Sequence, residues 1–142
     1  MTYLTDLYLK NFRLFNEFSL SLDQKNIVLG ENATGKTSIL ESLIILLTSR
    51  SFRTTQLKDC ISENKDFFIL KTKGNAGEET FEVTAKKDFK SRLFLKRKQE
   101  IGSRSAHVSW VDIITGRTFQ MIEGEPELRR DLFNSIMFHV EH

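Results

Sequence analysis

The fold is decided by residues 27–37, which read Ile27-Val28-Leu29-Gly30-Glu31-Asn32-Ala33-Thr34-Gly35-Lys36-Thr37. The last eight residues match the pattern G-x-x-x-x-G-K-[ST] at every fixed position. Glycines let backbone N–H groups turn toward a phosphate, and a helix that follows them directs its positive end at the same anion. The stretch therefore predicts a phosphate-binding loop between a strand and a helix.

Two side chains in this loop have a chemical task of their own. The Lys36 ammonium is expected on the β and γ phosphates of a nucleotide, and the Thr37 hydroxyl is expected to bind Mg²⁺. The alternative is an ordinary strand-to-helix turn with an incidental lysine. The predicted phosphate-binding set is Gly30, Glu31, Asn32, Ala33, Thr34, Gly35, Lys36 and Thr37.

The hydrophobic pattern changes its period across the loop. Residues 27–29 form an unbroken apolar run that ends at Gly30, which is typical of a strand buried on both faces. Beyond the loop the pattern predicts an amphipathic helix that ends near residues 48–51, with Glu41 and Ser42 off its apolar stripe. That stripe comprises Ile39, Leu40, Leu43, Ile44 and Leu47.

Short β-rich runs lie before and after this unit. Residues 5–9 and 18–22 alternate apolar and polar side chains, which predicts an antiparallel pair at the start of the chain. Downstream, an antiparallel meander is expected over about 67–114, followed by a helix over about 125–138 that Pro126 opens. The predicted strands of the meander are residues 67–73, 80–86, 92–98 and 107–114.

Composition indicates one folded domain of ordinary size. The 142 residues are 39% hydrophobic and 28% charged, with one proline, so a disordered chain is excluded. A net charge of +2 leaves room only for a local basic patch. The single cysteine, Cys60, excludes an internal disulfide framework and is expected in or near the core. The longest aliphatic run, residues 43–47, is too short to cross a bilayer, so we expect a cytoplasmic protein that makes no membrane contact.

Four segments together resemble a known family. Residues 7–13, 30–41, 49–54 and 123–130 stand in the order and spacing found in the RecF family, whose heads are ABC-type ATPases related to those of SMC proteins. The 29 residues before Gly30 fit that group better than small-molecule kinases, which begin with the strand of the loop. The resemblance implies an α/β P-loop NTPase of the ABC-ATPase-head type, and it covers residues 1–142 as the N-terminal part of such a head.

The resemblance also implies a function and partners. RecF proteins are bacterial recombination mediators, so we expect ATP and Mg²⁺ as cofactors and a role in DNA repair, DNA replication and the SOS response to DNA damage. The expected partners are DNA at single-strand gaps, double-strand ends and junctions, other recombination mediator proteins, and a second copy in an ATP-dependent homodimer.

Some expected features are absent from the sequence. Thr34 and Ser38 depart from the usual residues of the family, although the fixed positions of the loop are kept. No segment rich in serine and glycine and no apolar strand ending in an acidic pair occurs, and Asp112 is the nearest candidate for the acid. We therefore expect a truncated head, with its N-terminal lobe and meander, that does not hydrolyse ATP on its own.

Arg13, close to the loop in the predicted fold, has two possible readings. By resemblance, Asn11 and Arg13 lie beside the nucleotide, with Arg13 near the phosphates. By residue type alone, an arginine in a turn is usually a solvated surface group. Arg50 and Arg53, which follow the predicted helix, are interpreted as cations that favour its C-terminal end.

A basic run offers a candidate DNA contact. It places seven cations against one acid, Asp88, with phenylalanines and leucines interleaved. Such a surface could bind DNA phosphates independently of sequence, or it could be a strand edge that lysines keep soluble. The candidate residues are Lys86, Lys87, Lys90, Arg92, Lys96, Arg97 and Lys98.

Two other functional classes remain open. The first is a small P-loop phosphotransferase that acts on a metabolite, which the antiparallel meander and the long lead before Gly30 disfavour. The second is a stand-alone module that binds a nucleotide or DNA without catalysis.

Overall fold

The computed structural model describes residues 2–99 and residue 130 of the chain. Contacts divide the chain into two compact units, Met1–Val111 and Asp112–His142, and every helix and strand named below belongs to the first. The elements are β1 (Thr2–Phe12), β2 (Phe15–Ser21), α1 (Lys36–Thr48), the 3₁₀ turn η1 (Leu57–Cys60), β3 (Phe67–Ala76), β4 (Glu79–Asp88) and β5 (Phe94–Gln99).

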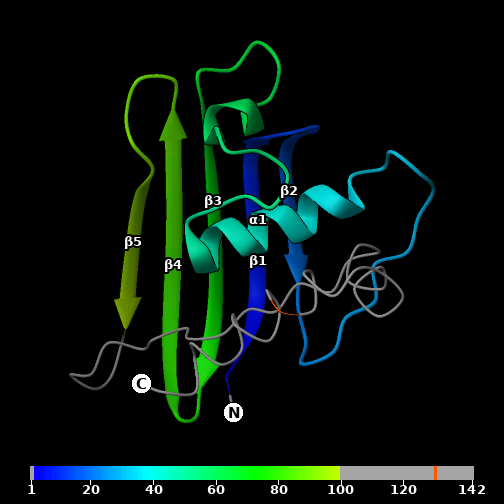
Figure 1. Ribbon diagram of the computed structural model, residues 1–142. Coiled ribbons are helices and arrows are strands. Elements are labelled where there is room, and N and C mark those ends of the chain that lie inside the picture. The colour runs from blue at the N-terminus through cyan, green and yellow to red at the C-terminus, as the bar shows by residue number, and fades with distance from the viewer. Residues whose placement is uncertain (1, 100–129, 131–142) are drawn as a thin grey trace. The chain divides into compact units, whose positions relative to one another are not determined.

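The strands form one five-stranded sheet in the order β2-β1-β3-β4-β5, with every neighbouring pair antiparallel (Figure 1). The predicted strands at 5–9, 18–22, 67–73, 80–86 and 92–98 are confirmed. Sequence reasoning treated the opening pair and the meander separately, whereas β1 pairs with β3 along most of its length. The opening hairpin and the meander are therefore one sheet.

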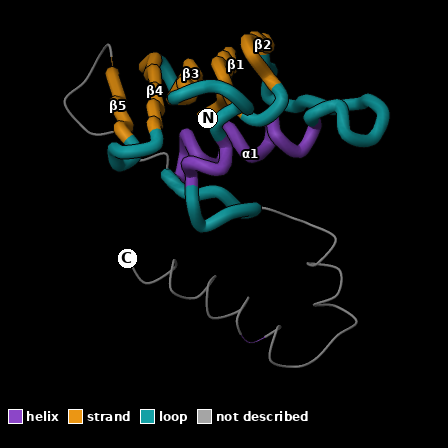
Figure 2. Tube along the Cα trace, turned by 90° about the horizontal axis from the view of Figure 1, so that it is seen from above, coloured by secondary structure: helices purple, strands orange, loops and turns teal. Residues whose placement is uncertain are grey.

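One face of this sheet carries the core. Helix α1 packs on that face, against β1, β3 and β4 (Figure 2). Side chains alternate between the faces, so Leu7 and Leu9 of β1 and Leu70 of β3 are buried beneath the helix while their neighbours are not. Phe12 packs edge-on against Phe68, with ring centroids 5.3 Å apart. The helix supplies Ile39, Ile45 and Leu46 to the same core.

The helix is confirmed, and its predicted buried face is right for Ile39 and Leu43, which pack in the core, but wrong for Leu40 and for the two polar residues beside it. Leu40, predicted on the apolar stripe, is 52% exposed, whereas Glu41 and Ser42 are fully buried. Both polar side chains find partners: the Ser42 hydroxyl donates to the Ile39 carbonyl, and Glu41 accepts hydrogen bonds from arginine. Because a buried polar group costs little when it is fully hydrogen-bonded, the helix can turn this side inward.

The prediction of a buried strand at residues 27–29 is also wrong. This run is an irregular connection, with Ile27 86% exposed and Leu29 85% exposed. A strand buried on both faces needs paired strands beside it, and within the described residues no strand pairs with this run. Only Val28 packs against the core.

The remaining sequence expectations lie outside the described residues. These are the strand at 107–114, Asp112, and the helix at 125–138 apart from Arg130, which is helical and exposed. Among the described helices, none is long and apolar enough to cross a membrane.

Two glycines near the β3–β4 hairpin give a test of the sheet. A Cβ on Gly74 would lie 2.6 Å from the Tyr3 carbonyl oxygen and 2.4 Å from the Phe81 ring, whereas a Cβ on Gly77 would meet nothing within 4 Å. Gly74→Ala should lower the free energy of unfolding by about 2 to 3 kcal/mol, because backbone on β1 must move. Gly77→Ala should cost only about 1 kcal/mol, from its positive φ of 67°. Urea unfolding followed by circular dichroism measures both, and equal losses would contradict the packing of β1 on β3.

Candidate nucleotide-binding site

The second glycine of the phosphate-loop motif, Gly35, could not be replaced by another residue without strain. Gly35 directly precedes α1 with φ 98°, in the region that favours glycine. A Cβ at this position would lie 2.6 Å from the Phe15 ring and 3.0 Å from the Leu14 side chain. The turn between β1 and β2 therefore packs directly against the loop, and the motif glycine makes that approach possible.

Lys36 lies over its own loop. Its Nζ donates to the carbonyls of Gly30 at 2.7 Å and Glu31 at 2.5 Å. The Thr34 hydroxyl donates to the Glu31 carbonyl at 2.8 Å, which holds the loop closed from the other side. The chain thus folds residues 30–36 around a single ammonium group, and the side chains of Asn32 and Ala33 remain exposed.

The N-terminus of α1 offers its backbone donors without competition from a side chain. Its first turn has no side-chain cap and no acidic residue, and the first backbone bond within it runs from the Ile39 N–H to the Gly35 carbonyl at 3.0 Å. The first N–H groups of a helix have no partner within it and carry a partial positive charge. Together with Lys36, they form a site whose chemistry suits a phosphate group.

Thr37 is the residue expected to bind a metal. It lies exposed in the first turn of α1, beside Lys36. Within residues 2–99, no three His, Cys, Asp or Glu side chains gather as a metal site. Mg²⁺ bound with a nucleotide usually takes few protein ligands and keeps phosphate oxygens and waters, so a single threonine hydroxyl fits that use.

A cavity of about 630 Å³ lies beside the loop. One wall is apolar and comes from β2, where the rings of Phe15 and Phe18 lie 4.8 Å apart. The rest of the lining combines the apolar run 27–29 with the polar side chains of Lys25, Thr34 and Lys36. Its volume falls in the range of pockets that hold small organic ligands.

Behind the loop, Arg13 and Glu41 form a buried ion pair that sequence reasoning missed. Arg13 Nε donates to Oε2 of Glu41 at 2.9 Å, and Nη2 donates to Oε1 at 2.6 Å. Arg13 Nη1 also donates to the Asp59 carbonyl at 2.9 Å. The Glu41 side chain is fully buried and that of Arg13 is 21% exposed, so the reading of Arg13 as a solvated group is wrong. Contact between Arg13 and a phosphate stays a prediction.

Glu41 gathers further donors from the segment after the helix. The Ser51 hydroxyl donates to Oε1 at 2.5 Å, and Arg53 Nη1 lies 3.4 Å from Oε2. Arg53 therefore pairs with a side chain within α1, and its interpretation as a cation at the helix end is wrong. Cys60 is fully buried next to the same carboxylate, with Sγ 3.7 Å from Oε1, which confirms it as a core residue.

The charges of this cluster follow from its contacts. Burial by itself raises the pKa of Glu41. Hydrogen bonds from Arg13 and Ser51, together with the charges of Arg13 and Arg53, lower this pKa by more than burial raises it, so the pKa lies below its usual value. The same hydrogen bond raises the pKa of Arg13. Burial, and then the neighbouring Glu41 charge, raise the pKa of Cys60 to about 12. At neutral pH the carboxylate is ionised and the thiol is neutral.

The candidate DNA residues do not share one surface. Lys86 and Lys87 end β4, Lys90 and Arg92 lie in the loop after it, and the other three lie on β5. Arg97 stands opposite the buried Val83 and so belongs to the face that α1 covers. Lys87 Nζ donates to the carbonyls of Asp88 and Ser91 within the turn. The sheet therefore separates Lys86, Lys96 and Lys98 from the rest of the run.

The fold is that of a P-loop NTPase head of the ABC-ATPase type, with its phosphate loop at the start of a helix packed on an antiparallel sheet. Residues 3–108 match the AAA ATPase domain family, and the chain belongs to it.

Within this class the chain resembles RecF. It is 36% identical over 132 residues to the DNA replication and repair protein RecF of Geobacillus thermodenitrificans, covering 90% of this chain and 35% of that protein. It is 30% identical over 146 residues to RecF of Saccharophagus degradans, covering 100% and 40%. The resemblance to RecF is confirmed, and the chain spans about two fifths or less of the length of these relatives.

Solved structures show the same fold. The recombination mediator protein RecF in its RecF-ATP structure superposes with a TM-score of 0.75 at 17% identity, over 99% of this chain and 40% of that one. The RecF-ATPrS structure gives a TM-score of 0.77 at 19% identity, over 99% and 39%. At these identities the match supports the predicted fold class.

The buried carboxylate can be tested by Glu41→Gln. The variant leaves two guanidinium groups without a counter-charge, so the free energy of unfolding at pH 7 should fall by about 3 kcal/mol. Because the folded-state pKa of Glu41 is lowered, its contribution is present above the unfolded pKa of about 4.3 and is lost as pH falls through the folded value. The gap between wild type and variant in urea unfolding should therefore narrow below about pH 4.

The exposed Glu63 supplies the matched control. Glu63→Gln should leave the unfolding free energy within about 0.5 kcal/mol of wild type. An equal effect of the two substitutions, or a gap for Glu41→Gln that stays constant across this pH range, would contradict the ion pair.

Proposed function

We propose that this chain is the ATP-binding part of a RecF-like ATPase that acts in DNA recombination, repair and replication. The observation that carries the proposal is the phosphate loop itself. Residues 30–37 keep every fixed position of the motif, wrap around the Lys36 ammonium and end at an uncapped helix N-terminus. The RecF relatives and the RecF-ATP structure support ATP as the ligand.

Each part of the loop has a role in this proposal. The phosphates of ATP accept hydrogen bonds from the N–H groups at the start of α1, and Lys36 transfers its hydrogen bonds from the loop carbonyls to the β and γ phosphates. Thr37 holds Mg²⁺, which neutralises phosphate charge when it is bound. Arg13 lies in the turn whose next two residues contact Gly35, which supports a role for it near the phosphates.

The wider role follows the family. DNA binding at single-strand gaps, double-strand ends and junctions, a part in the SOS response, ATP-dependent homodimers, recombination mediator partners and a cytoplasmic location are proposed here from the likeness to RecF. A metabolite phosphotransferase fits less well, because the described strands after the helix pair only in antiparallel fashion.

The loop assignment predicts the effect of Lys36→Ala. Removing this ammonium should abolish measurable ATP binding in isothermal titration calorimetry, since no other lysine lies over the loop among the described residues. Lys65→Ala is the matched control, because Lys65 is exposed and does not line the cavity beside the loop, so its ATP affinity should stay at the wild-type value. Both variants should keep the wild-type circular dichroism spectrum. Unchanged ATP affinity in Lys36→Ala would overturn the assignment.

Turnover separates the two functional classes. The sequence has no serine- and glycine-rich signature segment and no apolar strand with an acidic pair, so ATP hydrolysis by the 142-residue chain alone should stay at the background rate. A coupled phosphate-release assay measures this with wild type and with Lys36→Ala. Robust turnover that Lys36→Ala removes, or phosphate transfer to a small metabolite, would favour the phosphotransferase.

A further inference from the structure

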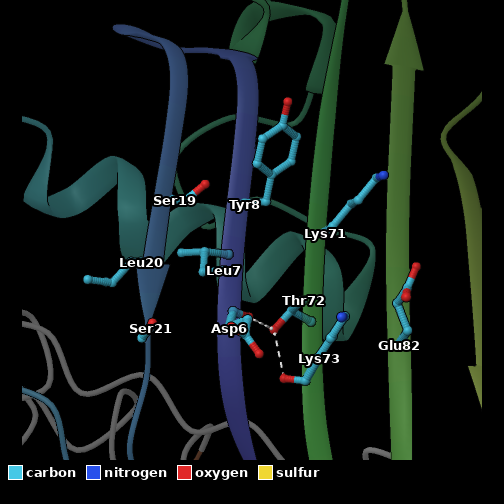
Figure 3. A pocket seen from close by; sticks show the side chains of 10 residues that line it. All are labelled: Asp6, Leu7, Tyr8, Ser19, Leu20, Ser21, Lys71, Thr72, Lys73 and Glu82. Carbon is cyan, nitrogen blue, oxygen red and sulfur yellow. Dashed lines mark hydrogen bonds between the residues drawn. The ribbon is translucent and has the colours of Figure 1, made fainter.

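The face of the sheet opposite α1, here called the open face, gathers lysines from four strands. Figure 3 shows two of them, Lys71 and Lys73 of β3. Residues directly opposite one another on neighbouring strands share a face, so the pairing register identifies its members. Lys71 stands opposite Tyr8 on one side and Thr84 on the other, and Thr84 stands opposite Lys96. The open-face lysines are Lys10, Lys71, Lys73, Lys86, Lys96 and Lys98.

Protection of a strand edge explains only some of these lysines. Lys96 and Lys98 lie on the edge strand β5, where lysines commonly prevent pairing with other chains. Lys71 and Lys73, however, lie on β3 in the middle of the sheet, and both are exposed. A central strand has no free edge to protect, so edge protection does not account for these two, although Lys73 stands directly opposite both Asp6 and Glu82.

The charge of the open face is not cancelled by its acids. Glu17 accepts a hydrogen bond from the Tyr8 hydroxyl, and Asp88 accepts two from backbone N–H groups in the turn after β4. Asp6 and Glu82 lie among the lysines without forming an ion pair to them in the described part of the chain. The open face therefore carries six ammonium groups against four carboxylates, which leaves a net charge of +2.

Aromatic rings lie among these lysines. Phe94 is 60% exposed and stands opposite Lys86 on the open face. Lys71 Nζ lies 5.9 Å from the centre of the Tyr8 ring, and Figure 3 shows these two side chains next to each other on adjacent strands. A hollow of about 400 Å³ opens in the middle of the face, and its lining includes Tyr8, Ser19, Lys71 and Glu82.

We propose that the open face binds single-stranded DNA, with the strand crossing the sheet from β5 toward β1. Neighbouring strands lie about 4.8 Å apart, so β3 and β5, with β4 between them, are about 10 Å apart, and their lysines can reach phosphates along one path. Phe94 stacks on a base, and the hollow beside Tyr8 receives a nucleotide further along. Sequence-independent sites of this kind combine a cationic track with aromatic platforms.

The proposal rests on the DNA binding suggested under the proposed function, but it assigns that binding to a different set of residues from the basic run of the sequence. Lys71 and Lys73, which lie outside the basic run of the sequence, become contacts. Lys87, Lys90, Arg92 and Arg97 of that run do not, because they lie in the turn or on the other face.

Two pairs of charge reversals distinguish DNA contact at the open face from a general effect of the chain's net charge. Lys71→Glu with Lys73→Glu should weaken binding of a fluorescein-labelled oligothymidylate by roughly ten-fold or more and reduce its salt slope by about 1.4. Lys90→Glu with Arg92→Glu changes the net charge equally in an exposed loop and should leave the affinity within about two-fold of wild type. Anisotropy titrations between about 50 and 200 mM salt measure both.

A matched aromatic pair tests stacking. Phe94→Ser should weaken oligothymidylate binding roughly five-fold or more, whereas Phe89→Ser, at a similarly exposed ring in the β4–β5 loop, should have no effect. Circular dichroism spectra and urea midpoints identify any variant that fails to fold. If the Lys71→Glu, Lys73→Glu variant misfolds, the double variant Lys71→Gln, Lys73→Gln is measured in its place.

Several outcomes overturn the proposal. Equal weakening by both charge pairs would show a general electrostatic effect. No weakening by either pair would exclude the open face as the DNA-binding surface. Loss of duplex binding instead, with Phe94→Ser silent, would assign the face to duplex phosphates. ATP affinity, measured on the same samples, separates these results from failure of the proposed function: a chain that binds ATP but no oligonucleotide refutes only the DNA site.

Discussion

The structure depends on one buried carboxylate. Glu41 is fully buried in α1, and its two oxygens accept hydrogen bonds from Arg13 in the β1–β2 turn and from Ser51 after the helix, with Arg53 completing the cluster. A buried carboxylate without partners would cost several kcal/mol, so the chain must bring these segments together around it. The Arg13 guanidinium, through the Asp59 carbonyl, also ties the turn to η1.

This ion pair positions the phosphate loop from behind. Arg13 holds the turn whose next residues, Leu14 and Phe15, pack against Gly35, and Gly35 begins the helix that carries Glu41. The loop is therefore held at its glycine by the hairpin and at its helix by the carboxylate. Such support from outside the site is what keeps phosphate-binding groups in position. The conformation of Lys36 over the loop carbonyls follows from that frame.

Local patterns predicted the strands, the helix and the phosphate loop, because alternation, helical spacing and glycine positions reflect the geometry of single elements. They misplaced Glu41, since an acidic residue at a helical position is usually exposed and its arginine partners lie 28 and 12 residues away. They also misread residues 27–29, whose apolar run favours a buried strand although no described strand pairs with it. The open face could not be predicted from the sequence for a related reason. Lys71 and Lys96 are brought onto one face only by the register of three strands.

If the structure depends on this ion pair, Arg13 and Glu41 are energetically coupled. A double-mutant cycle with Arg13→Gln, Glu41→Gln and the double variant, measured by urea unfolding at pH 7, tests it most directly. We predict a coupling free energy of about 1 to 3 kcal/mol, with the double variant less destabilised than the sum of the single ones. Additive effects, within about 0.5 kcal/mol, would contradict it.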